Sequence, residues 1–123
     1  GFDIDIATLS GNPVKLEMWA MPHEDAVVPA TFQKYSAQFK KPLKLADVLK
    51  NSLGEDSPYL AVFIPGGHGA LIGLPESEDL KILLKWAVAK DKFVISLCHG
   101  PTGLLAAALN EAHENYIFKG YKM

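Results

Sequence analysis

Two apolar runs of strand length organise the second half of the chain, at residues 59–64 (YLAVFI) and 93–97 (FVISL). A run without polar alternation is typical of a strand buried on both faces, as in a parallel sheet. Between the runs, residues 77–90 carry apolar positions at helical spacing, with Ser77 as the expected N-cap and Lys90 in the last turn. A second, small-residue helix is expected over 102–109. This strand–helix–strand–helix order predicts a βαβ unit with a parallel sheet.

The first half of the chain has weaker patterns. Residues 3–9 alternate polar and apolar positions and end at a Ser-Gly-Asn-Pro turn, which predicts a half-exposed strand. Residues 14–21 are expected to be extended. Helices are predicted over 24–39, where Pro29 blurs the start, and over 43–53, before Gly54. Together these elements predict a single α/β domain over residues 1–123.

Composition narrows the class of protein. Of 123 residues, 49% are hydrophobic and 21% are charged, which is typical of a globular domain. The net charge of −2, without a clustered basic face, argues against a nucleic-acid platform. No apolar run reaches the roughly 20 residues that a membrane helix needs, so no membrane partner is expected. A single cysteine excludes an intramolecular disulfide and suits a reducing compartment, so we predict a cytoplasmic protein.

That cysteine, Cys98, is the sharpest candidate for chemistry. It stands where an apolar strand turns into a helix, and ligands of open α/β sheets bind at the carboxyl ends of the strands. A side chain on such an elbow reaches out over the sheet edge, as in the serine elbow of α/β-hydrolases. The helix N-terminus beneath it favours thiolate, the form that attacks carbon. The alternative is that Cys98 is a small buried apolar residue.

Residues beside the elbow are the expected partners. His99 could orient or activate the thiol, although adjacent helical residues do not face one another, so a direct contact requires irregular geometry. Gly66, Gly67 and His68 follow the other apolar strand and should reach the same sheet edge, where their backbone N–H groups, with that of His99, could hold an oxyanion. The alternatives are a histidine bonded to backbone and an ordinary strand-to-helix turn. Candidate substrate-binding residues are therefore Gly66, Gly67, His68 and Gly100.

A sulfur-rich and aromatic stretch, including Trp19, Met21 and His23, is a candidate pocket wall. Core or lid packing is an equally good interpretation. Zinc is not expected, because the four histidines lack tight ligand spacing and no second cysteine exists. We expect no cofactor.

Long motifs now make the sequence recognisable. Residues 62–70 (VFIPGGHGA) and 94–101 (VISLCHGP) resemble the ThiJ/PfpI superfamily, and residues 15–23 (KLEMWAMPH) and 71–77 (LIGLPES) resemble its bacterial heat-shock protein 31 branch. The resemblance implies a flavodoxin-like sandwich with helices on both faces, and a homodimer. It implies Cys98 as nucleophile, His99 as triad histidine, and the backbone of Gly67 and His99 at the oxyanion site.

The resemblance also implies parts that this chain lacks. The triad aspartate is expected after Met123, and a glutamate that contacts the cysteine before Gly1, which predicts that the chain is a slice of a longer protein. Family members carry a metal cluster of two histidines and one carboxylate. Asp3 falls on the carboxylate, but Tyr35 falls on one histidine and the other is expected upstream. This departure argues further against zinc.

Three functions follow from the resemblance and the residues. The first is a cofactor-free enzyme of the glyoxalase III and deglycase type, a lyase and hydrolase acting through Cys98 on 2-oxoaldehydes such as methylglyoxal or on glycated proteins. The second is a stress-response holding chaperone that binds unfolded clients through exposed apolar surface. The third is a redox sensor in which Cys98 is oxidised.

Overall fold

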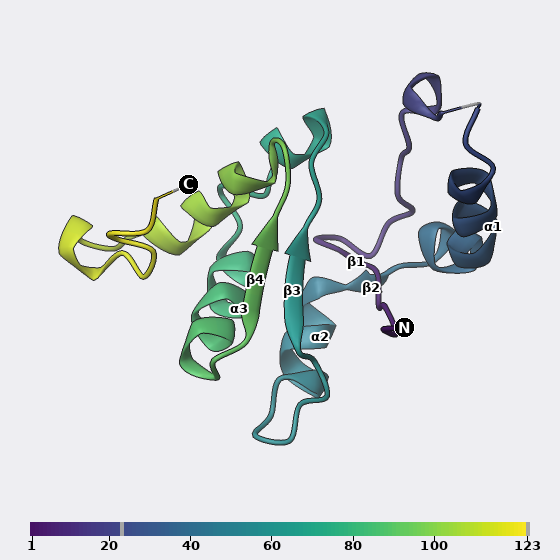
Figure 1. Cartoon of the computed structure of the whole chain (residues 1–123). Helices are drawn as coiled ribbons and strands as arrows, with labels where there is room; N and C mark the ends of the chain where they lie inside the picture. Colours follow the sequence, from purple (N-terminus) through teal and green to yellow (C-terminus); the bar gives the residue numbers. More distant parts are fainter. Residues whose placement is uncertain (23, 123) are drawn as a thin grey trace. The chain divides into compact units, whose positions relative to one another are not determined.

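The computed structural model describes residues 1–22 and 24–122, and they form two compact units, Gly1–Val48 and Leu49–Met123 (Figure 1). None of the helices in the described part of the chain is long and apolar enough to cross a membrane.

The first unit is built on a short parallel strand pair. Strand β1 (Ala7–Thr8) pairs with β2 (Leu43–Lys44), with Ala7 opposite Leu43. The strand predicted over residues 3–9 is therefore too long. The Gln38 side chain explains why, since it accepts a hydrogen bond from Ile6 N and donates one to Ile4 O, both at 3.0 Å. A side-chain amide thus takes the place of a strand partner at these positions.

The helices of the first unit depart from prediction at their beginnings. A 3-10 turn, η1 (Met18–Ala20), interrupts the segment expected to be extended. Helix α1 (Val27–Lys40) begins three residues later than expected, and Asp25 accepts a hydrogen bond from Val27 N at 2.8 Å. Pro29 lies in the first turn, where a missing N–H breaks no helical hydrogen bond. Helix α2 (Leu45–Ser52) follows β2 directly.

The second unit contains the predicted βαβ motif. Strands β3 and β4 are parallel, with Ala61 opposite Phe93 and Ile64 opposite Ser96. Helix α3 begins after Ser77, whose hydroxyl accepts a hydrogen bond from Leu80 N at 3.1 Å, so the predicted N-cap is confirmed. The elements in order are β3 (Ala61–Ile64), η2 (His68–Leu71), α3 (Glu78–Ala89), β4 (Phe93–Ser96), η3 (Gly100–Ala108) and η4 (His113–Asn115).

The core of this unit lies between the sheet, α3 and η3. Leu84 is fully buried, and a Cβ added to Gly103 would lie 3.3 Å from Ile64 Cγ2 and 3.4 Å from a methyl of Leu80. Only a small residue lets η3 come this close to the strand and to α3. The expected second helix therefore exists, but it begins at Gly100 and has 3-10 geometry.

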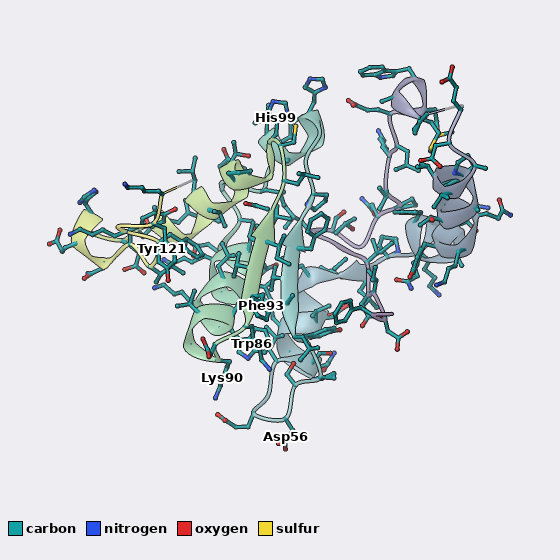
Figure 2. The ribbon with its side chains drawn as sticks, in the orientation of Figure 1. Asp56, Trp86, Lys90, Phe93, His99 and Tyr121 are labelled. Atoms are coloured by element: carbon teal, nitrogen blue, oxygen red, sulfur yellow. The ribbon has the colours of Figure 1, made fainter. Side chains whose placement is uncertain are left out.

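Burial of the two strands alternates, which differs from the prediction that both faces are buried. Ile64 is 4% exposed, whereas Phe63 is 56% and Ile95 is 48% exposed. Phe93, at the start of β4, is also exposed (Figure 2). An apolar run indicates that a strand can be covered on both faces. In the described part of the second unit, α3 and η3 pack against the sheet face that carries Ile64, and the face that carries Phe63 is exposed.

Ion pairs tie the far end of η3 to α3. Lys85 pairs with Glu111, Lys81 Nζ lies 3.2 Å from the same carboxylate oxygen, and Lys81 also donates a hydrogen bond to Leu109 O. The hydrogen bond from Lys85 is the main cause that lowers the pKa of Glu111 below its usual value, and the hydrogen bond from Lys81 lowers it further. This cluster therefore fixes the segment that follows the C-terminal end of η3, whereas Cys98 precedes its N-terminal end.

Candidate active site

Cys98 lies on a sharp turn between β4 and η3, and its backbone is left-handed, with φ of 57°. A non-glycine residue in this region is strained, by about 1–2 kcal/mol. The turn is closed by a hydrogen bond from Gly100 N to Leu97 O at 2.7 Å, and Leu97 N donates to Ile64 O at 3.2 Å. The elbow expected from the sequence is present, and Cys98 on it is exposed rather than buried in the core.

Two glycines allow the elbow to approach the end of β3. A Cβ on Gly66 would lie 2.5 Å from Cys98 Cβ and 2.8 Å from Leu97 O. A Cβ on Gly100 would lie 2.3 Å from Ile64 O. These contacts are too short for any side chain, so both glycines are needed for close backbone approach.

The thiol and the neighbouring imidazole are in contact. Cys98 Sγ lies 3.8 Å from His99 Nδ1, a distance at which sulfur can exchange a weak hydrogen bond. Regular helix geometry would point these adjacent side chains apart, and the positive φ of Cys98 removes that obstacle. Figure 2 shows His99 beyond the carboxyl end of β4, the edge where ligands of parallel sheets bind.

The loop after β3 reaches the same place. Gly67 has φ of 86°, which suits glycine, and His68 begins η2. The rings of His68 and His99 lie with centroids 5.6 Å apart and planes inclined by 33°. The structure thus brings together six of the predicted site residues: Gly66, Gly67, His68, Cys98, His99 and Gly100.

Sequence reasoning missed Thr102, which connects the two loops. Its hydroxyl lies 2.7 Å from His99 O and 3.2 Å from Ala70 O, and it can donate its proton to either oxygen. A threonine three residues after a helix-start histidine is a signal for such a bond back to the carbonyl. The second acceptor, Ala70, is 32 residues away in sequence, so only the fold could reveal it.

The predicted pocket wall belongs to the first unit. Met21 lines an apolar cavity of about 290 Å³, with Leu16, Val28, Thr31, Phe32 and Phe39, whereas Trp19 is 76% exposed. His23 lies outside the described residues. Cys98 belongs to the second unit, so a role for Trp19 or Met21 beside the thiol stays a prediction.

Asp3, the weak candidate for a metal carboxylate, is exposed near the start of the first unit. Across residues 1–22 and 24–122, no three His, Cys, Asp or Glu side chains gather closely enough to hold a metal ion.

The second unit has a parallel α/β fold. Its exposed thiol lies on a strained strand-to-helix turn, beside a histidine and a glycine-rich loop, and this arrangement is a candidate nucleophile elbow. The chain belongs to the DJ-1/PfpI family, whose model matches residues 23–120. It is 57% identical over 123 residues to the protein/nucleic acid deglycase HchA of Pseudomonas aeruginosa strain UCBPP-PA14 and 56% identical to that of Staphylococcus aureus strain MSSA476. The resemblance stated from the motifs is therefore confirmed.

The chain covers 42% of the Pseudomonas protein and 41% of the Staphylococcus protein, although each match includes the whole of this chain. A crystal structure with 24% sequence identity superposes with a TM-score of 0.65, over 93% of this chain and 45% of the other. These matches confirm the flavodoxin-like α/β class.

Proposed function

We propose that this chain carries the nucleophilic part of a cysteine-dependent, cofactor-free active site that converts 2-oxoaldehydes to 2-hydroxy acids and removes related adducts from proteins. The observation that carries the proposal is the exposed Cys98 at φ 57° with its Sγ 3.8 Å from His99 Nδ1. Strain at a polar, exposed elbow is typical of functional sites. The name deglycase, given to both relatives, supports adduct removal.

The first chemical step is addition of the thiolate to the aldehyde carbon of methylglyoxal, which gives a hemithioacetal. His99 accepts the thiol proton. The oxygen that becomes negative accepts hydrogen bonds from backbone N–H groups of Gly67 or His68 and of His99. Gly66 and Gly100 take part by allowing the two loops to approach one another.

Next, a base moves a proton from C1 to C2 through an enediol, which leaves a 2-hydroxy thioester. Water cleaves the thioester, releases lactate and restores the thiol. C1 is oxidised and C2 is reduced, so no external oxidant is needed. The resemblance assigns the base to a glutamate, and the third triad member to an aspartate, outside residues 1–123. Deglycation would use the same thiol and the same N–H groups on a carbonyl-derived adduct.

The test is lactate formation from methylglyoxal without glutathione, in the full-length protein. Cys98→Ala should abolish the activity and His99→Ala should reduce it at least about a hundredfold, within the range for general acid–base catalysis. His113→Ala is the matched control, because His113 is an exposed histidine on η4. Full activity of Cys98→Ala would refute the proposal.

A holding chaperone is the second candidate, and one surface observation favours it. Trp19 is 76% and Met18 is 54% exposed in the first unit. Such apolar side chains could bind unfolded clients. Suppression of client aggregation that persists in Cys98→Ala but is lost in Trp19→Gln would support this function.

Exposure of the Cys98 thiol also supports a redox sensor. Mass spectrometry after mild peroxide treatment tests it. An unoxidised Cys98 that still reacts with an alkylating agent would contradict the sensor. The cytoplasmic location and the homodimer are likewise proposals.

A further inference from the structure

The side chain of His68 has no part in the steps above, yet its ring lies on that of His99. We infer that His68 is a positioning residue, which holds the His99 imidazole toward Cys98 and is itself held by the Thr102 link between the two loops. This inference rests on the proposed function for its role in turnover, and on the thiol–imidazole contact for its physical basis.

The resemblance assigns an aspartate as the third triad member, and His68 acts in addition to it. Among the described residues His99 is exposed and its side chain can rotate about two torsions, so packing against the core of the second unit does not fix it. The Cys98–His99 contact at 3.8 Å exists in only some of these rotamers. A neighbouring ring at contact distance reduces the number of rotamers open to the imidazole.

The geometry of His68 suits this task. Its centroid lies 5.6 Å from that of His99, within the 4.5–7 Å range of interacting aromatic pairs, and the two ring planes are inclined by 33°. His68 comes from the β3 loop and His99 from the β4 loop, so the contact also joins the two halves of the site.

Thr102 contacts the backbone of the turn that carries His68. Its hydroxyl lies between His99 O at 2.7 Å and Ala70 O at 3.2 Å. Ala70 belongs to the same 3-10 turn as His68, and Ala70 N donates to Gly67 O at 3.1 Å. The backbone of the η2 turn that carries His68 therefore lies within hydrogen-bond distance of the same hydroxyl that contacts His99 O, and the single hydroxyl proton serves one of these oxygens at a time.

The experiment uses the full-length protein and two readouts. One is kcat and KM for methylglyoxal. The other is the rate of Cys98 alkylation by iodoacetamide, which does not depend on the proposed reaction. His68→Ala should lower kcat and the alkylation rate about two- to tenfold, the range expected for loss of an aromatic pair, with KM unchanged within about twofold.

Conservative variants separate positioning from other roles. His68→Phe keeps a ring but no ring nitrogen, so it should restore both rates to within about twofold of wild type. Thr102→Val should lower both rates, and Thr102→Ser should restore them because it keeps the hydroxyl. Since both residues act through one turn, Thr102→Val should have a smaller effect in the His68→Ala background than in wild type. His113→Ala is the control for loss of an exposed histidine.

Two results would overturn the inference: unchanged kcat and alkylation in His68→Ala, or a His68→Phe variant as slow as His68→Ala, which would show that the imidazole nitrogens themselves matter. Failure of the proposed function is distinguished from either, because absence of lactate formation in wild type leaves the alkylation series to decide the role of His68.

Discussion

Gly66→Ala is the sharpest test of how the fold presents the thiol. The added Cβ would lie 2.5 Å from Cys98 Cβ, 2.8 Å from Leu97 O and 3.4 Å from Cys98 Sγ. Carbon atoms in contact prefer about 3.5–4.0 Å, so the elbow must move by about 1 Å. The first two contacts are near the backbone and cannot be relieved by rotating a flexible side chain.

The cost can be estimated from opposing terms. Overpacking costs about 1–3 kcal/mol. Replacing glycine with alanine also lowers the conformational entropy of the unfolded chain, which stabilises the fold by about 0.4–1 kcal/mol. This gain applies here because the φ of Gly66 is not left-handed. We therefore expect the free energy of unfolding to fall by up to roughly 2.6 kcal/mol. A displacement of about 1 Å at a reacting group can slow a reaction up to about a hundredfold, so lactate formation should fall further than stability.

Gly69→Ala is the matched control. No atom lies within 4 Å of a Cβ built there, and its φ is not left-handed, so stability should rise by about 0.4–1 kcal/mol and the rates should stay near those of wild type. Urea unfolding gives the stability, and iodoacetamide alkylation of the folded protein reports on Cys98. If Gly66→Ala matches Gly69→Ala in both measurements, the close approach of the two loops does not position the thiol.

Three further changes test other parts of the second unit. Leu84→Ala should lower the free energy of unfolding by about 2–5 kcal/mol in urea, because the side chain is fully buried, and a loss under 1 kcal/mol would contradict the packing. Lys85 lowers the pKa of Glu111, so this pair stabilises the fold above the ordinary carboxyl pKa and is lost as pH falls through the folded pKa. Melting temperatures from pH 6 to 3 should therefore fall less steeply in Glu111→Gln than in wild type, and parallel curves would argue against the pair. Cys98→Gly should be more stable than Cys98→Ala by up to about 1.6 kcal/mol in urea, since glycine adopts the left-handed backbone without strain but loses more entropy on folding, and a Cys98→Gly variant less stable than Cys98→Ala would refute the strain.

Sequence patterns predicted the elements of the second unit well because each is defined by local chemistry. Ser77 marks the start of α3 with a capping side chain, and the apolar stripe behind it matches a helix. The order of elements then requires a parallel β3–β4 pair, which places both loops at one sheet edge. This reasoning placed Cys98, His99 and Gly66 at one sheet edge, where the structure has them, without any long-range contact being known.

What the patterns missed depends on contacts between distant segments. The side chain of Gln38 replaces a strand partner for residues 4–6, which local alternation cannot reveal. Burial of Phe63 depends on which elements cover each sheet face, and the run of apolar residues is the same in either case. The bond from Thr102 to Ala70 likewise joins positions that only the folded chain brings together.

The left-handed backbone of Cys98 distinguishes it from the other strained positions. Among the described residues, the non-glycine positions with positive φ are Asp91, Cys98 and Asn110. Asp91 follows the end of α3 and Asn110 follows the end of η3, where left-handed residues commonly terminate helices, and Asp and Asn tolerate this conformation best. Cys98 instead precedes a helix, and its side chain gives no such tolerance. Glycine would fit the turn without strain but would carry no thiol. Strain at an exposed thiol on the sheet edge is typical of functional sites, and it therefore supports the proposal that Cys98 is the nucleophile.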